Sequence, residues 1–160
     1  MPPKSAPSPS PVTAATETPI VFARVGSHHD LPVPSRATPG AAGIDLAAAE
    51  AVTIKAGNAV TPVRLGFAVA IPEGYVGLLC VRSGLAKRGV SLTNGVGVID
   101  ADYRGELAGL FTKMTPKDLT VEAGERVAQL VIVPVLTAPI SEGELPSTKR
   151  GSGGFGSTGR

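Results

Sequence analysis

The chain has 160 residues, of which 42% are apolar and only 4% aromatic, and its formal net charge is +2. This length predicts one domain with a largely aliphatic core. The small net charge argues against a dedicated nucleic-acid binder, and no segment is long and apolar enough to predict a membrane partner. A single cysteine, Cys80, excludes a disulfide framework, and its apolar neighbours predict burial. It favours a reducing, cytoplasmic location, with the nucleus as the alternative in a eukaryotic or viral setting.

The first nineteen residues contain six prolines together with many Ser, Thr and Ala residues. Such a segment cannot bury enough apolar surface to order itself, so we expect a disordered arm over residues 1–19. The sequence gives no indication of which protein partner, if any, this arm binds.

From residue 20 to about residue 145 the pattern favours β-structure. Apolar residues alternate with other residues over residues 63–71 and again over residues 52–54, and residues 126–135 form a longer apolar run. Turn signals recur at short intervals, as at Asn94-Gly95. Many short strands with regular turns predict an all-β sandwich or barrel, such as a jelly roll.

Residues 83–87 form the one segment that resembles a helix, with Ser83 as its expected N-cap and Gly89 after its end. The N-terminal end of a helix attracts anions, and Arg82 adds a fixed positive charge there. The alternative is a capped helix that binds no ligand.

Two polar residues interrupt apolar strands. Asp45 lies in the apolar run of residues 42–46, where a carboxylate needs partners or a cation; the alternative is a turn aspartate that bonds its own backbone. Gln129 interrupts the long apolar strand, and a buried amide must be hydrogen-bonded, either to the backbone or to a ligand phosphate.

Residues 94–106 carry the densest polar cluster of the chain. The Asn94-Gly95 pair between two apolar stretches predicts a hairpin. Asp100 and Asp102 share one face of an extended chain, and a carboxylate beside another acid can act as a general base. The alternative is a polar loop stabilised by a pair between an aspartate and Arg104. The density of polar groups favours a functional role.

Residues 151–160 contain five glycines and Phe155, which alone would indicate a low-complexity end. Glycine-rich backbone can also bind phosphate through its N–H groups, and an aromatic ring can lie on a planar ligand. The pair His28-His29 has no third metal ligand at suitable spacing and is expected at the surface. No Ser-His-Asp order, Cys/His metal pattern or P-loop is present, so conventional nucleophilic hydrolysis is not supported.

Taken in order, five segments resemble the motifs of the trimeric dUTPase family, and the resemblance spans residues 20–160. They are residues 42–46, 82–86, 97–106, 124–129 and 150–159. The resemblance implies a distorted jelly-roll β-barrel with one short helix, assembled as a homotrimer whose active sites are each shared by three chains. It also implies three segments: the arm of residues 1–19, a jelly-roll domain of residues 20–145, and a flexible lid of residues 146–160.

The resemblance further implies hydrolysis of dUTP to dUMP and pyrophosphate, which keeps uracil out of DNA and supplies dUMP for dTMP synthesis. Asp100 would activate the water that attacks the α-phosphorus. Mg²⁺ would be held by triphosphate oxygens and water, with Asp45 acting through a coordinated water.

The expected substrate contacts follow from the same resemblance. Those for the α- and β-phosphates are Arg82, Ser83, Gly84 and Gln129; those for uracil and the sugar are Asn94, Gly97, Val98, Ile99 and Tyr103; those from the tail are Arg150, Phe155, Gly156, Ser157 and Thr158. Tyr103 would exclude the 2′-hydroxyl of ribose, and Phe155 would cover the uracil ring.

Three alternatives remain at this stage. A dCTP deaminase of the same superfold would need a catalytic glutamate and cytosine recognition. A nucleotide-gated interaction or regulatory protein would use dUTP binding to switch a contact with a partner. A jelly-roll structural or coat protein would not need the five polar motifs.

Overall fold

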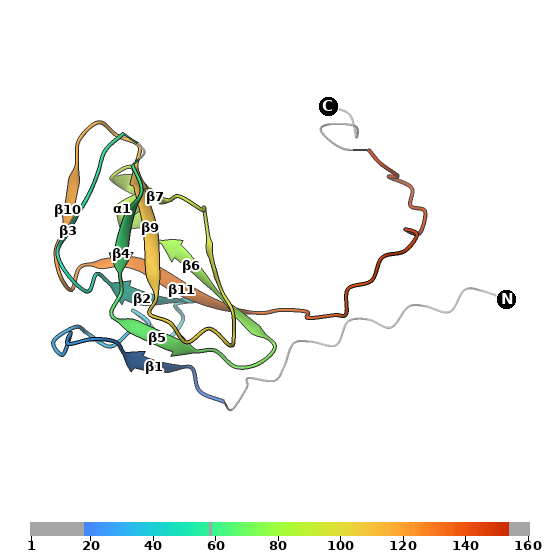
Figure 1. The fold of residues 1–160 in the computed structure, drawn as a ribbon, viewed down its shortest axis with the longest axis horizontal. Helices are drawn as coiled ribbons and strands as arrows, with labels where there is room; N and C mark the ends of the chain where they lie inside the picture. The colour runs from blue at the N-terminus through green and yellow to red at the C-terminus, as the bar shows by residue number, and fades with distance from the viewer. Residues whose placement is uncertain (1–17, 58, 154–160) are drawn as a thin grey trace.

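The computed structural model describes residues 18–57 and 59–153, which form eleven strands and one short helix (Figure 1). The elements in chain order are β1 Val21–Arg24, β2 Gly43–Ala47, β3 Val52–Ile54, β4 Thr61–Arg64, β5 Phe67–Ala70, β6 Tyr75–Val81, α1 Ser83–Lys87, β7 Val90–Leu92, β8 Gly97–Ile99, β9 Ala108–Lys113, β10 Leu119–Val121 and β11 Arg126–Pro134. Within the described ranges, no helix has the length and apolar character needed to cross a bilayer.

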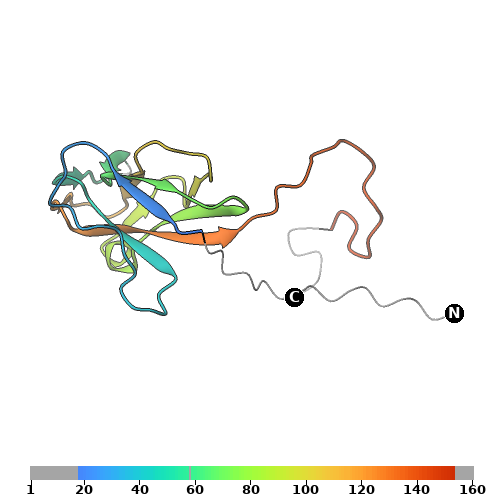
Figure 2. The same ribbon diagram turned by 90° about the horizontal axis from the view of Figure 1, so that it is seen from below.

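The strands form four antiparallel sheets. The largest has the order β2-β11-β6-β8, a second has the order β4-β9-β7, and the pairs β1-β5 and β10-β3 complete the set. These sheets enclose one main core. Figures 1 and 2 show the arrangement of the strands from two directions. The all-β jelly roll with one short helix is therefore confirmed.

The core consists mainly of Leu, Ile, Val and Ala side chains, with Phe67 and Phe111 as its two fully buried aromatic rings. Alternation along β6 buries Gly77 and Leu79 but turns Cys80 toward the other face, where it is only half-buried. The predicted burial of Cys80 is wrong for this reason.

The alternating run over residues 63–71 forms two strands instead of one. The chain breaks between β4 and β5 at Gly66, whose φ of +69° lies in the left-handed region that glycine adopts readily. The alternate apolar side chains on both sides of the break are nevertheless buried, from Val63 to Ile71. The alternating pattern therefore predicted which side chains are buried, but it did not predict the interruption between the two strands.

The predicted hairpin at Asn94-Gly95 is also wrong. β7 pairs with β9 and β8 pairs with β6, so the turn carries the chain from one sheet to the other. Gly95, with a φ of +71°, permits the tight turn. The flanking strands find better partners in the two sheets than in each other, which places Asn94 at the junction between them.

After β11, residues 135–153 run away from the barrel without joining a sheet (Figures 1 and 2). Three large apolar side chains of this segment are almost fully exposed: Leu136 at 89%, Ile140 at 100% and Leu145 at 92%. So much exposed aliphatic surface is typical of a segment that packs against another molecule.

The core predicts a clear contrast between two neighbours on β9. Phe111→Ala should lower the free energy of unfolding by about 3–5 kcal/mol, because it removes a fully buried ring and leaves a cavity. Leu110→Ala, on the exposed face of the same strand, should change it by about 0.5 kcal/mol or less. Urea unfolding followed by circular dichroism measures both, and equal effects would contradict this assignment of the core.

Candidate active site

Pairing of β2 with β11 sets Asp45 directly opposite Gln129. The Asp45 carboxylate bridges two guanidinium groups: Arg82 Nε lies 2.8 Å from Oδ1, and Arg126 Nη1 donates to Oδ2 at 2.9 Å. The Asp45 side chain is only 10% exposed, so these charge-assisted bonds compensate its loss of water. Asp45 therefore lies on a strand and fixes the direction of both arginines.

A pocket of about 300 Å³ opens beside this cluster, lined by Arg82, Gly84, Leu85, Arg88, Glu125 and Arg126. Glu125 pairs with Arg88 at 2.8 Å. Three arginines against the Glu125 and Asp45 carboxylates leave an excess of positive charge, which favours an anionic ligand.

The start of α1 differs from the prediction. Arg82, in an extended conformation, is the N-cap, and Ser83 is the first helical residue; no side chain caps the helix. Leu85 and Ala86 donate the first backbone bonds to Arg82, so the N–H groups of Ser83 and Gly84 have no acceptor inside α1. Open space surrounds the position of a Cβ on Gly84, which leaves this backbone accessible. Gly89 follows the helix as predicted, with a φ of +81°.

Gln129 lies over Gly43 of the neighbouring strand. A Cβ at Gly43 would come within 2.3 Å of Gln129 Oε1, so a larger residue there would displace the amide from this position. Gln129 Nε2 donates to the Val81 carbonyl at 3.5 Å, a long bond to the backbone just before Arg82. The amide thus lies beside Asp45 and next to the backbone that leads into Arg82. The sequence analysis assigned no role to Gly43 or Arg126. Both lie inside the motif segments, Gly43 two residues before Asp45 and Arg126 three residues before Gln129.

The residues expected to contact uracil lie at the junction of the two larger sheets. Asn94, Gly97, Val98 and Ile99 line a pocket of about 170 Å³. The rest of its wall is Leu79, Leu92, Ala108, Gly109 and Leu110. This small pocket with backbone at its wall can accept a planar polar group.

Asp100 directly follows β8, whose pairing with β6 fixes its backbone. Asp100 and Asp102 are both exposed and line a pocket of about 510 Å³ that also includes Tyr75 and Val98. Within residues 18–57 and 59–153, no hydrogen bond or ion pair engages either carboxylate.

Arg104 does not pair with either of these aspartates. Its Nη1 donates to the carbonyls of Ala101 at 2.6 Å and Tyr103 at 2.9 Å. The alternative of a loop held by an aspartate–arginine pair is therefore wrong, and both acids remain available for chemistry.

Tyr103 folds back over its own loop. Its hydroxyl donates to the Glu106 carbonyl at 3.2 Å, and its ring lies against Gly105. The residue is 44% exposed, so part of it is accessible to a ligand.

The two groups of polar residues lie at opposite ends of β6. Because Ile99 pairs with Gly77, Asp100 lies beside Val76, whereas Arg82 follows the last residue of the strand. A rise of roughly 3.3 Å per residue separates these ends by about 20 Å. One chain therefore presents two partial sites and does not bring Asp100 to Arg82.

Arg150 lies in the exposed tail, where its Nε donates to the Gly153 carbonyl at 2.8 Å. Phe155, Gly156, Ser157 and Thr158 lie outside the described residues.

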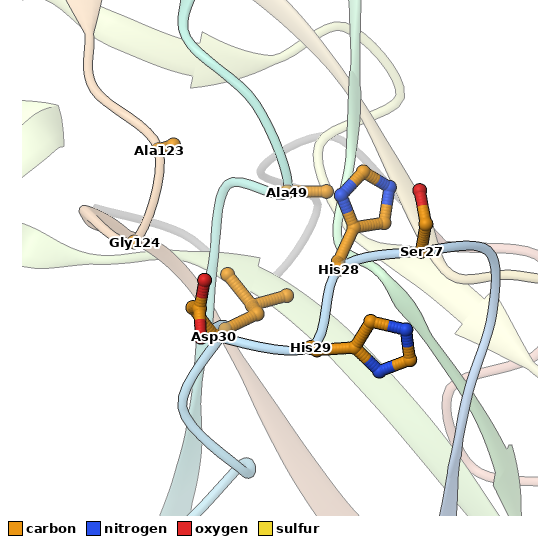
Figure 3. A pocket seen from close by; sticks show the side chains of 8 residues that line it. Ser27, His28, His29, Asp30, Ala49, Ala123 and Gly124 are labelled. Atoms are coloured by element: carbon orange, nitrogen blue, oxygen red, sulfur yellow. The ribbon is translucent and has the colours of Figure 1, made fainter.

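The pair His28-His29 lines a separate pocket of about 300 Å³, together with Ser27, Asp30, Leu31, Ala49, Ala123 and Gly124 (Figure 3). His28 is half-buried and His29 is exposed. Across the described part of the chain, no three His, Cys, Asp or Glu side chains are grouped so that they could hold a metal ion.

Binding of magnesium does not require three protein side chains grouped around the ion. Mg²⁺ keeps several waters and is often bound by one or two carboxylates plus substrate phosphates. The exposed Asp100 and Asp102 and the arginine-bound Asp45 fit an ion that arrives with a triphosphate. Each Asp45 oxygen already accepts from an arginine, which fits contact with such an ion through water.

A jelly roll with a positively charged pocket at a helix start and unpaired aspartates after a strand defines a class of phosphate-ester-binding β-proteins. The family model for dUTPase matches residues 29–159. The deoxyuridine 5′-triphosphate nucleotidohydrolase of Rhodococcus erythropolis is 47% identical over 133 residues, covering 81% of this chain and 80% of the relative. That of Sinorhizobium medicae is 44% identical over 156 residues, covering 93% and 97%. The chain belongs to the dUTPase family.

Solved structures agree with this assignment. The dUTPase of Staphylococcus bacteriophage 80alpha with dUPNHPP has a TM-score of 0.77 and 31% identity, covering 90% of this chain and 99% of that one. A mutant dUTPase of phage phi11, described with a structural Mg(II) ion, has a TM-score of 0.73 and 25% identity, covering 82% and 100%.

The Asp45 cluster predicts a measurable contribution to stability. Asp45→Asn should lower the free energy of unfolding by about 1–3 kcal/mol, because it removes charge-assisted bonds to two arginines. Lys55→Gln, which breaks the exposed Lys55–Asp118 pair, should cost about 0–1 kcal/mol. Chemical unfolding at one ionic strength compares the two variants, and a smaller effect at Asp45 would refute its anchoring role.

Proposed function

We propose that this chain hydrolyses dUTP to dUMP and pyrophosphate, with Asp100 as the general base. The observation that carries the proposal is the contrast among its acids. Asp45, Glu106 and Glu125 are held by arginines, whereas Asp100 and Asp102, within a motif segment, have no ion pair among the described residues and line a pocket together with Glu73. Asp100 has the more firmly held backbone, since it directly follows β8.

In the proposed reaction, Asp100 accepts a proton from water as the water oxygen bonds to the α-phosphorus. The bond from that phosphorus to the bridging oxygen breaks on the opposite side, and pyrophosphate leaves with the bond electrons. Catalysis of this kind depends mostly on positioning and charge neutralisation. Mg²⁺ bound to the triphosphate supplies further neutralisation of its oxygens.

Substrate recognition is proposed to divide among three parts of the molecule. The backbone of residues 94–99 would read the edge of uracil, and the Tyr103 ring would pack on the sugar where a 2′-hydroxyl would clash. Arg82, Gln129 and the N–H groups of Ser83 and Gly84 would bind phosphates, supported by the positive charge of their pocket.

We further propose a homotrimer with shared sites. About 20 Å of β6 separates Asp100 from Arg82, whereas the proposed reaction requires both to reach one triphosphate. A neighbouring copy can supply the missing half. The exposed Leu136, Ile140 and Leu145 of the tail give such a copy an apolar surface to cover.

The remaining assignments are also proposals. Residues 146–160 would close over bound nucleotide as a lid, with Arg150, Ser157 and Thr158 at the terminal phosphate, Gly156 allowing close approach and Phe155 over uracil. Residues 1–19 would lie outside the jelly-roll domain of residues 20–145. A cytoplasmic location and the absence of nucleic-acid and membrane partners fit an enzyme acting on a free nucleotide.

Asp100→Asn tests the general base. It should lower pyrophosphate release from dUTP by about 10²–10⁴-fold while dUTP still binds in calorimetry, because only the proton acceptor is lost. Asp102→Asn is the matched control, with the smaller effect. Comparable activity of Asp100→Asn and the unmodified protein would remove Asp100 from this role. The same assay of pyrophosphate release should be run with dUTP, dCTP, dTTP and UTP. Ammonia release from dCTP is measured in parallel, since it would favour a deaminase.

Subunit mixing tests the shared site. Asp100→Asn and Arg82→Ala should each be nearly inactive alone, because each lacks one half of the site. Unfolding them together and refolding should restore activity in about a quarter of the sites, those that combine the two intact halves. Activity that stays at the level of the separate variants would show that both residues act within one chain.

A further inference from the structure

Residues 100–107 connect β8 to β9 and are called here the Asp100 loop. The side chain of Glu106 joins the end of this loop to the break between β4 and β5. Its Oε2 accepts hydrogen bonds from Arg64 Nε at 2.7 Å and from Arg64 Nη2, and its Oε1 accepts from the Gly66 N–H at 3.0 Å. The carboxylate raises the pKa of Arg64, mainly through these side-chain bonds. Both oxygens of Glu106 are thus engaged, and the side chain is only 12% exposed.

The backbone on the far side of Glu106 is fixed by the same strand break. Leu107 donates to the Phe67 carbonyl at 2.8 Å and accepts from the Leu65 N–H at 3.0 Å, and its side chain is fully buried. Glu106 is therefore the last residue of the loop before a firmly held position.

Tyr103 depends on this end of the loop. Its hydroxyl donates to the carbonyl of Glu106, so the position of that carbonyl sets the position of the ring. A Cβ on Gly105 would come within 2.3 Å of Tyr103 Oη, which shows how closely the ring follows the backbone between them. The ring has no second side-chain bond among the described residues.

We propose that Glu106 is a positioning residue for nucleotide selectivity: held by Arg64 and the Gly66 N–H, it fixes the carbonyl that orients Tyr103, and so sets how strongly ribonucleotides are rejected. This inference rests on the proposed function, in which Tyr103 packs on the sugar. Glu106 itself touches no reacting atom.

The chain offers a matched control for this arrangement. Asp118, before β10, likewise accepts from one backbone N–H, that of Ala56 at 2.8 Å, and from one cation, Lys55 Nζ at 2.9 Å. The hydrogen bond from the Ala56 N–H lowers the pKa of Asp118 most, and the hydrogen bond from Lys55 lowers it further. The Asp118 carboxylate binds residues next to the β10-β3 sheet and not residues of the Asp100 loop. Since neither bond involves the loop that carries Tyr103, a change in selectivity confined to the Glu106 variants would be specific to that loop.

The experiment compares Glu106→Ala, Glu106→Gln and Asp118→Ala by the ratio of kcat/KM for dUTP to that for UTP. Glu106→Ala should lower this ratio by about tenfold or more, because the ring is no longer held against ribose. Glu106→Gln keeps an oxygen for the Gly66 N–H and should stay within about threefold of the unmodified protein, as should Asp118→Ala. Arg64→Met, at a side chain that is 55% exposed, should fold; because it keeps the Gly66 bond to Glu106, it should shift the ratio no further than Glu106→Gln does.

A second readout does not require activity. The chain has two tyrosines, so ring-labelled tyrosine gives two sets of NMR signals, and Tyr103→Phe assigns them. Glu106→Ala should move the Tyr103 ring signals, and Asp118→Ala should leave them in place.

The outcomes separate this inference from the proposed function. If the unmodified protein hydrolyses dUTP but Glu106→Ala keeps its selectivity ratio, or leaves the Tyr103 signals unmoved, the positioning role is overturned and the hydrolysis stands. If the unmodified protein does not hydrolyse dUTP, the proposed function and the selectivity role both fall.

Discussion

The antiparallel pairing of β11 with β2 on one side and β6 on the other is the constraint on which the rest of the site depends. It sets Gln129 opposite Asp45 and ends β6 at Val81, directly before Arg82, so an acid, two arginines and an amide meet at one end of the sheet. The same strand β6 holds β8 at its other end and so fixes Asp100. The positions of these polar residues are well defined because the residues lie on paired strands or directly next to them.

The acids of the motif segments divide into structural and chemical roles by their partners. Asp45 and Glu106 are bonded at both oxygens, whereas Asp100 lies open to solvent and is the residue proposed to accept a proton. This division also explains how few acids a Mg²⁺-assisted reaction on a triphosphate needs from the protein, because the substrate brings much of the oxygen coordination.

The sequence predicted the β-class, the short helix and the long final strand, since period two and turn residues depend on local chain geometry. It failed at Gly66 and Asn94-Gly95, where long-range pairing decided which strand continued and which partner it took. Ser83 was expected to cap α1, but the extended Arg82 precedes the helix and fills that position. The bridging role of Arg126 and the room left by Gly43 depend on register between strands, which no single segment reveals.

The distance along β6 has a consequence for how the protein behaves in a cell. If each site needs atoms from more than one copy, an isolated chain is folded yet inert, and specific activity becomes a function of protein concentration. Dilution then acts as an off-switch without any inhibitor. Synthesis of the chain, and the strength of the contacts between copies, would set the threshold at which nucleotide clearance begins.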